Sequence, residues 1–166
     1  KYFGTDGFRG DVNVALTARH AYEIGRFIGW YFTKKRRGVK NEDGEIRSRV
    51  VIGKDPRLSS YMYEYALSAG LTASGADACL LHVTTTPSVS YVTRTEDFDC
   101  GIMISASHNP YTDNGIKIFD ALGGKADERL IDLIETHLAA VDADQRRAEL
   151  PYATGGSVGR TVDFIA

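Results

Sequence analysis

Apolar and polar positions along this chain follow two alternating periods. Behind Thr17, apolar residues recur at helical spacing through Ile24, Phe27 and Tyr31, which predicts an amphipathic helix over residues 18–33 with Thr17 as its N-cap. Helical spacing and helix-start signals predict further helices, at about residues 60–75, 86–95 and 126–141. Short apolar runs between them predict buried strands, at residues 50–53, 78–83, 101–104 and 115–119.

Strands and helices that alternate in this way are typical of a mostly parallel sheet covered by helices on both faces. We therefore expect an α/β fold, a three-layer α/β/α domain with a mostly parallel (mixed) sheet. Residues 1–150 are expected to form this domain, and residues 151–166 to be a linker and the start of a truncated second domain. Residues 34–49 are almost all charged or polar, which predicts an exposed loop.

Composition excludes several classes of protein. The net charge is −2, so neither nucleic acid nor an anionic membrane surface is an expected partner. No apolar run is long enough to span a bilayer, and a cytoplasmic location is the default expectation. The only two cysteines, Cys79 and Cys100, each lie alone in an apolar stretch, which favours buried free thiols over a disulfide.

The segment Ser105–Pro110, named the serine loop below, carries the strongest chemical signal. It directly follows a predicted buried strand, and ligands of α/β sheets lie outside the carboxyl ends of strands. Ser107 is therefore a candidate nucleophile, and Asn109 and Pro110 favour a tight loop around it. An ordinary exit from a strand into a turn explains the same residues equally well on physical grounds alone.

A serine hydrolase is disfavoured. Such an enzyme needs a base that faces the serine, whereas His108 is the adjacent residue, and neighbouring side chains in an extended loop usually point apart. The chain also has no Gly-x-Ser-x-Gly elbow.

Other segments carry weaker signals. Glycines in Gly4–Gly10 allow a close approach of the backbone to a ligand, and Arg9 there is suited to phosphate, although a simple turn is favoured for this segment alone. Lys117 in its apolar strand faces either solvent or the serine loop, where it would suit proton transfer. For Arg57, in the segment Asp55–Ser60, contact with an anion is one interpretation, and helix capping is favoured for the segment.

Two further sets of residues are expected to have no catalytic role. The scattered histidines are interpreted as surface or hydrogen-bonded side chains: His20, His82 and His137. The segment Asp142–Arg147 has only two acids, which is too few for a carboxylate metal loop.

Four segments together point to a family. They are Gly-Thr-Asp-Gly-Phe-Arg-Gly at residues 4–10, Gly-Lys-Asp-Pro-Arg-Leu-Ser at 53–59, Ser-Ala-Ser-His-Asn-Pro at 105–110 and Asp-Asn-Gly-Ile-Lys at 113–117. In this order they resemble the α-D-phosphohexomutase family, over essentially residues 1–145. The opening and the serine loop look most like the phosphoglucosamine mutase branch of that family.

The resemblance implies a reversible interconversion of glucosamine 6-phosphate and glucosamine 1-phosphate. It implies that Ser107 carries the phosphoryl group and that a hexosamine 1,6-bisphosphate is the intermediate. It further implies that His108 contacts the phosphoserine, that Arg9 lies close by and that Lys117 is the general acid/base. The remaining residues expected at the substrate and phosphate loops are Thr5, Asp6, Gly7, Asn109 and Pro110.

The resemblance also implies parts that this sequence does not contain. Family members have four domains and hold Mg²⁺ with the phosphoserine oxygen, here on Ser107, and an Asp-x-Asp-x-Asp-Arg loop that is absent from this sequence. Domains II–IV are therefore the expected partners, and the isolated chain is expected to fold without turning over substrate. A phosphoglucomutase/phosphomannomutase and a non-catalytic phosphosugar-binding module remain the alternatives.

Overall fold

A computed structural model describes residues 1–35, 44, 47–145 and 149–164. The strands described form one sheet in the order β1-β5-β4-β2-β3-β6. Their bounds are β1 Phe8–Asp11, β2 Arg49–Lys54, β3 Asp77–Val83, β4 Cys100–Ile104, β5 Asp113–Phe119 and β6 Thr161–Asp163. The helices are α1 Ala18–Lys35, α2 Leu58–Ala73, α3 Thr86–Thr95 and α4 Glu128–Asp142, with the short 3₁₀ helix η2 at Gly155–Ser157.

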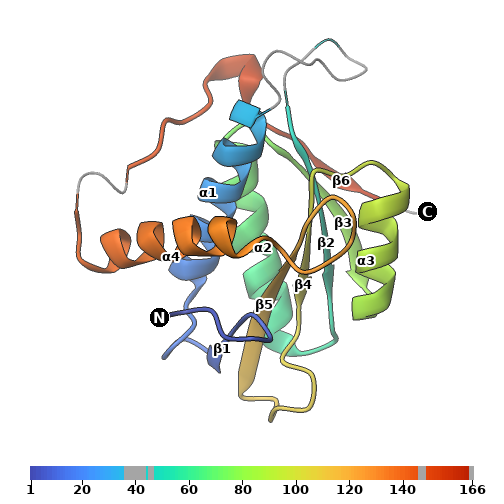
Figure 1. The fold of residues 1–166 in the computed structure, drawn as a ribbon, viewed down its shortest axis with the longest axis vertical. Helices are drawn as coiled ribbons and strands as arrows, with labels where there is room; N and C mark the ends of the chain where they lie inside the picture. Colours follow the sequence, from blue (N-terminus) through green and yellow to red (C-terminus); the bar gives the residue numbers. More distant parts are fainter. Residues whose placement is uncertain (36–43, 45–46, 146–148, 165–166) are drawn as a thin grey trace.

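The sheet is mixed, as expected from the sequence. Strands β4, β2, β3 and β6 run parallel to one another, whereas β5 lies antiparallel to both β4 and β1. Figure 1 shows α3 on one side of the sheet and α1, α2 and α4 on the other. The three-layer α/β/α architecture is therefore confirmed.

The main core lies between the sheet and the three-helix layer. Alternate residues of β4 and β5, among them Ile102 and Ile116, point into this layer and pack with Ile24 of α1, Leu67 of α2 and Ile134 of α4. A smaller cluster on the α3 side joins Val89, Met103 and Phe119. Helix α3 packs on β4 and β2 of this face, whereas Arg9 of β1 and Lys117 of β5 are partly exposed, so the part beside β5 and β1 is named the open side below.

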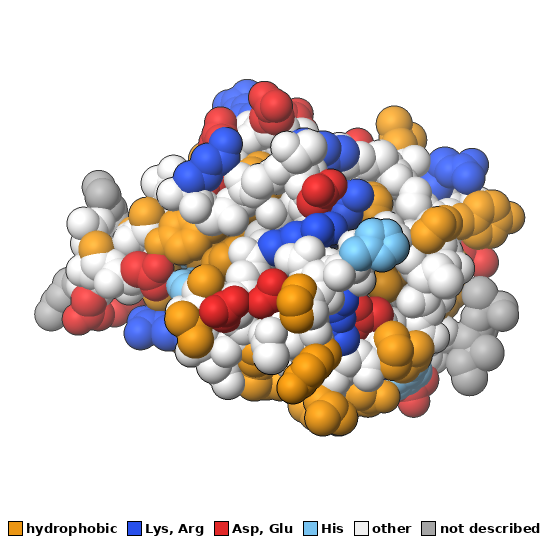
Figure 2. All heavy atoms as spheres, turned by 90° about the horizontal axis from the view of Figure 1, so that it is seen from below, with side chains coloured by type: hydrophobic (Ala, Val, Ile, Leu, Met, Phe, Trp, Pro, Cys, Tyr) orange, Lys and Arg blue, Asp and Glu red, His pale blue; other side chains and the backbone are white. Residues whose placement is uncertain are grey.

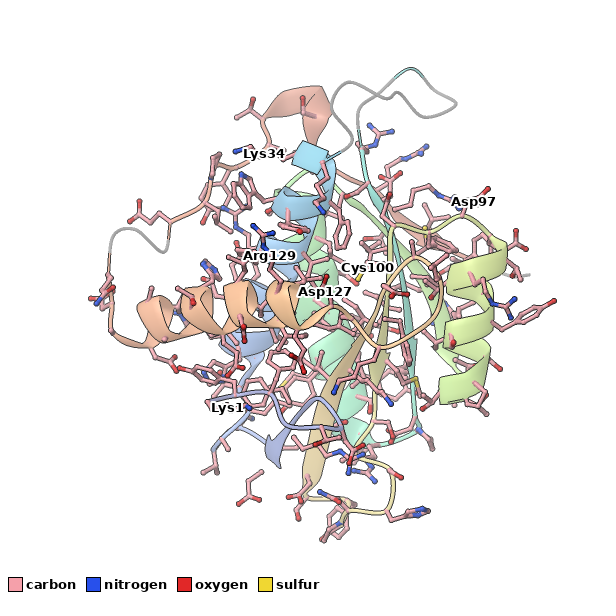
Figure 3. The ribbon with its side chains drawn as sticks, in the orientation of Figure 1. Lys1, Lys34, Asp97, Cys100, Asp127 and Arg129 are labelled. Atoms are coloured by element: carbon pink, nitrogen blue, oxygen red, sulfur yellow. The ribbon has the colours of Figure 1, made fainter. Side chains whose placement is uncertain are left out.

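The structure corrects several expected boundaries. Strand β1, which overlaps the end of the glycine-rich opening and pairs with β5, was not predicted. Helix α3 is capped by Thr85, since the Ser88 N–H donates to Thr85 Oγ1. Helix α4 begins at Glu128, two residues after its predicted start, because Asp127 is its N-cap and the Asp127 carboxylate accepts the N–H of Arg129 at 2.8 Å (Figure 3).

Most of the charged loop predicted at residues 34–49 lies outside the described part of the chain. Residues 36–43 and 45–46 lie outside the described residues. Helix α1 continues to Lys35, and Arg47 is buried, with its Nε 3.2 Å from Asp77 Oδ1, so the exposed loop does not extend to residue 49. At the other end of the chain β6 pairs with β3, so residues 161–163 extend the same sheet; the division of the chain after residue 150 stays a prediction.

Both cysteines are buried free thiols, as expected. Burial raises the pKa of the Cys100 thiol well above its ordinary range, which keeps it unreactive. Figure 3 shows Cys100 within the body of the molecule, between the helical layers. Within the described part of the chain, no helix has the length and apolarity that crossing a membrane requires.

Candidate functional site

The serine loop connects β4 to its antiparallel neighbour β5 at the lower end of the sheet in Figure 1. Ala106 is fully buried and anchors the loop, whereas Ser107 is exposed. The backbone of Ser107 has a φ of 54°, in the left-handed region that serine rarely adopts. Such a conformation costs about 1–3 kcal/mol and persists only where surrounding contacts hold it.

Arg57 provides such contacts. Its Nη2 donates to the carbonyl oxygen of Ser107 at 2.8 Å and to that of Asn109 at 2.9 Å, and its Nη1 donates to the carbonyl of Asp113 at 3.0 Å. Its Nε lies 3.2 Å from Asp55 Oδ2. The guanidinium group therefore ties the middle of the serine loop to the first residue of β5.

Capping of α2 was favoured for this segment by the sequence. Arg57 occupies the N-cap position, but no described side chain accepts a hydrogen bond from the first turn of α2. Asp55 Oδ1 instead accepts the Arg57 N–H at 3.1 Å and the Ser60 hydroxyl at 2.7 Å, which stabilises the turn into the helix. The segment therefore turns the chain into α2 without supplying a side-chain cap, and the Arg57 side chain bonds to the serine loop.

Asn114 is a second supporting residue that the sequence did not single out. It is fully buried, and its Nδ2 donates to Ser59 Oγ at 2.9 Å and to Ser60 Oγ at 3.0 Å. A buried amide at the start of an apolar strand was the available signal, because such a group requires partners. These bonds join β5 to the start of α2.

Asn109 and Asp113 close the serine loop on its own side, with Asn109 Nδ2 donating to Asp113 Oδ2 at 3.2 Å. Asp11 of β1 lies opposite Asp113 in the register. A hydrogen bond with Asp113, together with the negative charge of that residue, raises the pKa of Asp11. The two carboxyl groups therefore lie side by side at the base of the loop.

The register brings Arg9 and Lys117 to the same face of the sheet. Arg9 lies opposite Gly115, and Lys117 lies opposite Met103. Directly opposed residues share a face, and Gly115 and Lys117 are two apart on β5, so all four point to the open α3 side. Gly115 leaves room for the arginine, because a Cβ there would lie 2.9 Å from Arg9 Cγ.

Arg9 retains an unused donor. Its Nε is buried and has no hydrogen-bond partner among the described residues. A buried donor without a partner is costly, so Arg9 carries an unfilled hydrogen bond in this structure. Two cationic side chains, Arg9 and Lys117, thus line the open face beside the serine loop.

The glycine-rich opening packs directly against β5. Gly7 has a φ of 93°, and a Cβ there would lie 2.4 Å from the carbonyl oxygen of Ile116. This contact leads Thr5 and Asp6, both exposed, past the edge of β5. A cavity of about 250 Å³ lies beside this contact. It is lined by residues of α4 and by Lys1, Thr5, Gly7 and Lys117, and Figure 3 labels Lys1.

His108 is exposed at the tip of the serine loop, next to the exposed Pro110, and has no hydrogen bond with any described residue. Figure 2 views the molecule from the end where this loop lies. It shows Lys and Arg side chains beside a histidine in the middle of the face and hydrophobic side chains toward the lower edge. Acidic side chains lie among them, so this face is polar and carries both signs of charge.

The other histidines are hydrogen-bonded away from this site, as interpreted from the sequence. The Nε2 atoms of His20, His82 and His137 lie 2.9–3.1 Å from the carboxylates of Asp142, Asp163 and Glu23, respectively. Among the residues that the structure describes, no three His, Cys, Asp or Glu side chains lie together as a metal-binding group. These residues therefore do not form a Mg²⁺ site by themselves.

Comparison with known proteins places this geometry in context. A family model described as phosphoglucomutase/phosphomannomutase, alpha/beta/alpha domain I, matches residues 1–145. The chain is 61% identical over 166 residues to a phosphoglucosamine mutase of Lachnospira eligens and 44% identical over 165 residues to one of Bacillus cereus. The two matches extend over 100% and 99% of this chain but over only 34% of each relative. The chain therefore spans about a third of the length of these relatives.

Solved structures agree on the fold. A phosphoglucomutase/phosphomannomutase family protein of Burkholderia thailandensis superposes with a TM-score of 0.71 at 25% identity, over 98% of this chain and 32% of that one. A phosphomannomutase-like protein of Thermus thermophilus gives a TM-score of 0.68 at 30% identity, over 97% of this chain and 32% of that one.

Proposed function

The chain belongs to the phosphoglucomutase/phosphomannomutase family, as its α/β/α domain I, and on that premise we propose that it is the phosphoserine-bearing domain of a phosphoglucosamine mutase. The full protein would interconvert glucosamine 6-phosphate and glucosamine 1-phosphate. The curated relatives named above, at 44–61% identity, carry that name. Because the chain spans about a third of them, the isolated chain is expected to fold without turning over substrate.

The observation that carries this proposal is the exposed Ser107, held with a φ of 54° at the end of β4 and next to the open face that bears Arg9 and Lys117. A nucleophile that hands over a phosphoryl group must be accessible and fixed in orientation. Ser107 combines both properties.

The proposed reaction has two balanced halves. O1 of glucosamine 6-phosphate forms a bond to the phosphorus on Ser107 while the Ser107 Oγ–P bond breaks, which leaves the 1,6-bisphosphate and a serine that takes up a proton. After the sugar turns over in the site, Ser107 Oγ attacks the 6-phosphoryl group and glucosamine 1-phosphate leaves with its O6 protonated. Lys117 is the proposed carrier of the sugar hydroxyl proton in both halves.

The other site residues serve the phosphate. A phosphoserine carries close to two negative charges at neutral pH, so nearby cations stabilise it. His108 beside Ser107 would contact that phosphate, and Arg9 would direct its unpartnered Nε to an anion on the same face. The remaining proposed contacts of the substrate and phosphate loops are Thr5, Asp6, Gly7, Asn109 and Pro110.

Mg²⁺ is proposed for the full protein only. The described residues form no metal-binding group, so its ligands besides the phosphoserine oxygen would come from other domains of the same polypeptide. When bound, such a cation would neutralise charge on the phosphoryl group.

A phosphoglucomutase/phosphomannomutase is the second candidate, since the solved neighbours carry those names at 25–30% identity. The higher identity to phosphoglucosamine mutases favours the amino sugar. Rates with glucosamine, glucose and mannose phosphates on the full-length protein would rank the three substrates. A rate with glucose or mannose phosphate above that with glucosamine phosphate would reverse the order.

The mechanism is tested by phosphosite mapping. Full-length protein is incubated with Mg²⁺ and glucosamine 1,6-bisphosphate and its peptides are analysed by mass spectrometry. One phosphoryl group is expected on Ser107, absent from Ser107→Ala and retained in Ser157→Ala, an exposed serine of η2. An unlabelled Ser107, or equal labelling of the Ser107→Ala variant, would reject the phosphoserine mechanism.

A further inference from the structure

Arg57 stands at the start of α2, after the carboxyl end of β2, and its side chain reaches across to the serine loop instead of serving its own helix. Both ends of this connection are fixed to the sheet. The Asp55 N–H donates to the carbonyl of Ile104 at 3.0 Å, and Asp55 also pairs with the Arg57 guanidinium. The arginine is therefore held at its base as well as at its tip.

The guanidinium group has little capacity left for a ligand. Its hydrogen bonds to the carbonyls of Ser107, Asn109 and Asp113 use three of the five N–H donors of an arginine, and its Nε is paired with the Asp55 carboxylate at 3.2 Å. The side chain is only 12% exposed. A bidentate grip on a substrate phosphate needs two free, accessible donors, so an anion-binding role does not fit this geometry.

One of the carbonyl groups that accept a hydrogen bond from Arg57 belongs to Ser107 itself, so this bond restrains the backbone of Ser107. A left-handed φ at a residue with a Cβ is unfavourable, and relaxation to the right-handed region would redirect the Cα–Cβ bond and with it the hydroxyl. Ser107 N–H donates to Ser105 Oγ at 3.0 Å, which is a local contact only. The contacts of Arg57 with Ser107 and Asn109 come from the start of α2, distant in sequence, and resist that relaxation.

We propose that Arg57 is a positioning residue that holds Ser107 in its left-handed conformation and so aims its hydroxyl for phosphoryl transfer, an inference that rests on the proposed function of Ser107. The positive charge acts through the loop carbonyls and not by contact with substrate. Removing it would misdirect the nucleophile while the substrate-binding surfaces remain.

The test compares full-length wild type with Arg57→Ala, Arg57→Lys and the control Arg94→Ala, an exposed arginine in the last turn of α3. A displacement of about 1 Å at a reacting group costs about 100-fold in rate, so kcat of both Arg57 variants is expected to fall by about that factor. KM should change by less than about threefold, because substrate binding is untouched. Arg94→Ala should behave as wild type.

Two further readouts separate positioning from general damage. Millimolar methylguanidinium should raise the kcat of Arg57→Ala about tenfold, because it occupies the site that the arginine side chain has left. It should leave the kcat of Arg57→Lys unchanged. Hydrogen exchange should accelerate in the peptide that spans residues 105–112 of Arg57→Ala, while peptides of β2 and β3 keep wild-type protection.

The outcomes discriminate between the two proposals. Unchanged kcat in Arg57→Ala, with Ser107 of the wild type normally phosphorylated, would overturn the positioning role alone. A loss of kcat without rescue and with faster exchange throughout the domain would also overturn it, since that pattern reports unfolding. A wild type that takes up no phosphate on Ser107 would overturn the proposed function and this role with it.

Discussion

Lys54 Nζ lies 2.7 Å from Glu64 Oε2, and neither side chain is more than 3% exposed. Lys54 ends β2 and Glu64 belongs to α2, so the pair joins the sheet to the helix whose N-cap is Arg57. Lys54 Nζ also lies 4.3 Å from the centre of the Tyr61 ring. A charge buried to this extent is stable only with a partner.

Removing one member of this pair should be costly. Glu64→Ala leaves the Lys54 charge buried and uncompensated, and we expect it to lower the free energy of unfolding by about 3–5 kcal/mol. The double variant Lys54→Met/Glu64→Leu should lose less than the single variant, because it removes both charges and keeps the volume. Urea denaturation of the wild type, Glu64→Ala and the double variant measures the three free energies of unfolding. A double variant less stable than Glu64→Ala would contradict this account.

The N-terminal segment should contribute to stability in a pH-dependent way. Tyr2 Oη donates to Asp142 Oδ2 at 2.5 Å, and His20 Nε2 lies 3.1 Å from Asp142 Oδ1. Burial, followed by the hydrogen bond to Asp142, raises the pKa of Tyr2 to about 12. Burial alone would raise the pKa of Asp142, but the hydrogen bonds from Tyr2 and His20 outweigh it and hold that pKa below its usual 3.8.

The sign of each effect follows from these directions. Because the pKa of Tyr2 is raised on folding, the Tyr2 hydroxyl stabilises the folded state fully below pH 10, and this stabilisation is lost between pH 10 and about 12. Because the pKa of Asp142 is lowered on folding, its carboxylate stabilises the folded state above pH 3.8, and this stabilisation is lost as the pH falls further. Wild type should therefore exceed Tyr2→Phe in stability by the largest margin between pH 5 and 9, measured by urea denaturation across pH. A margin independent of pH would reject the proposed linkage.

Helices α1 and α2 cross at a contact that admits no side chain on Gly70. A Cβ there would lie 2.1 Å from the carbonyl oxygen of Tyr22. Alanine gains about 1 kcal/mol over glycine in helix propensity, but this overlap with backbone should outweigh it, and we expect Gly70→Ala to lose about 1–3 kcal/mol. The control is Gly156→Ala, where nothing lies within 4 Å. Thermal unfolding should shift downward for Gly70→Ala only, and equal shifts would reject the steric explanation.

Lys117 should be required for the chemistry in the full-length protein. Lys117→Met removes the proposed proton carrier, and general acid/base groups typically contribute about 10²–10⁴-fold, so kcat should fall within that range. The control is Lys34→Met, an exposed lysine in the last turn of α1 that Figure 3 places at the end of the molecule away from the serine loop. Steady-state assays of both variants measure kcat. A fall in kcat of less than about tenfold in Lys117→Met would contradict the proposed proton-transfer role of Lys117.

Much of the architecture follows from local pattern. The four helices were predicted with each end within two residues of the observed one, because apolar spacing and capping signals act over one or two turns. The four buried strands and the position of the serine loop after β4 followed in the same way. Strand β1 was missed because its residues, Phe8–Asp11, have no apolar alternation, and its partner β5 lies far along the chain.

The sequence by itself determined the α/β layering, the family resemblance and the candidate Ser107, because hydrophobic period and motif are properties of neighbouring residues. Only the tertiary structure decided that Arg57 holds the serine loop while Asp55 accepts the Ser60 hydroxyl, and that Arg9 and Lys117 share one face. Those relationships depend on strand order and register. Register is set by packing of the whole sheet, so residues that are distant in sequence become partners only once the sheet has formed.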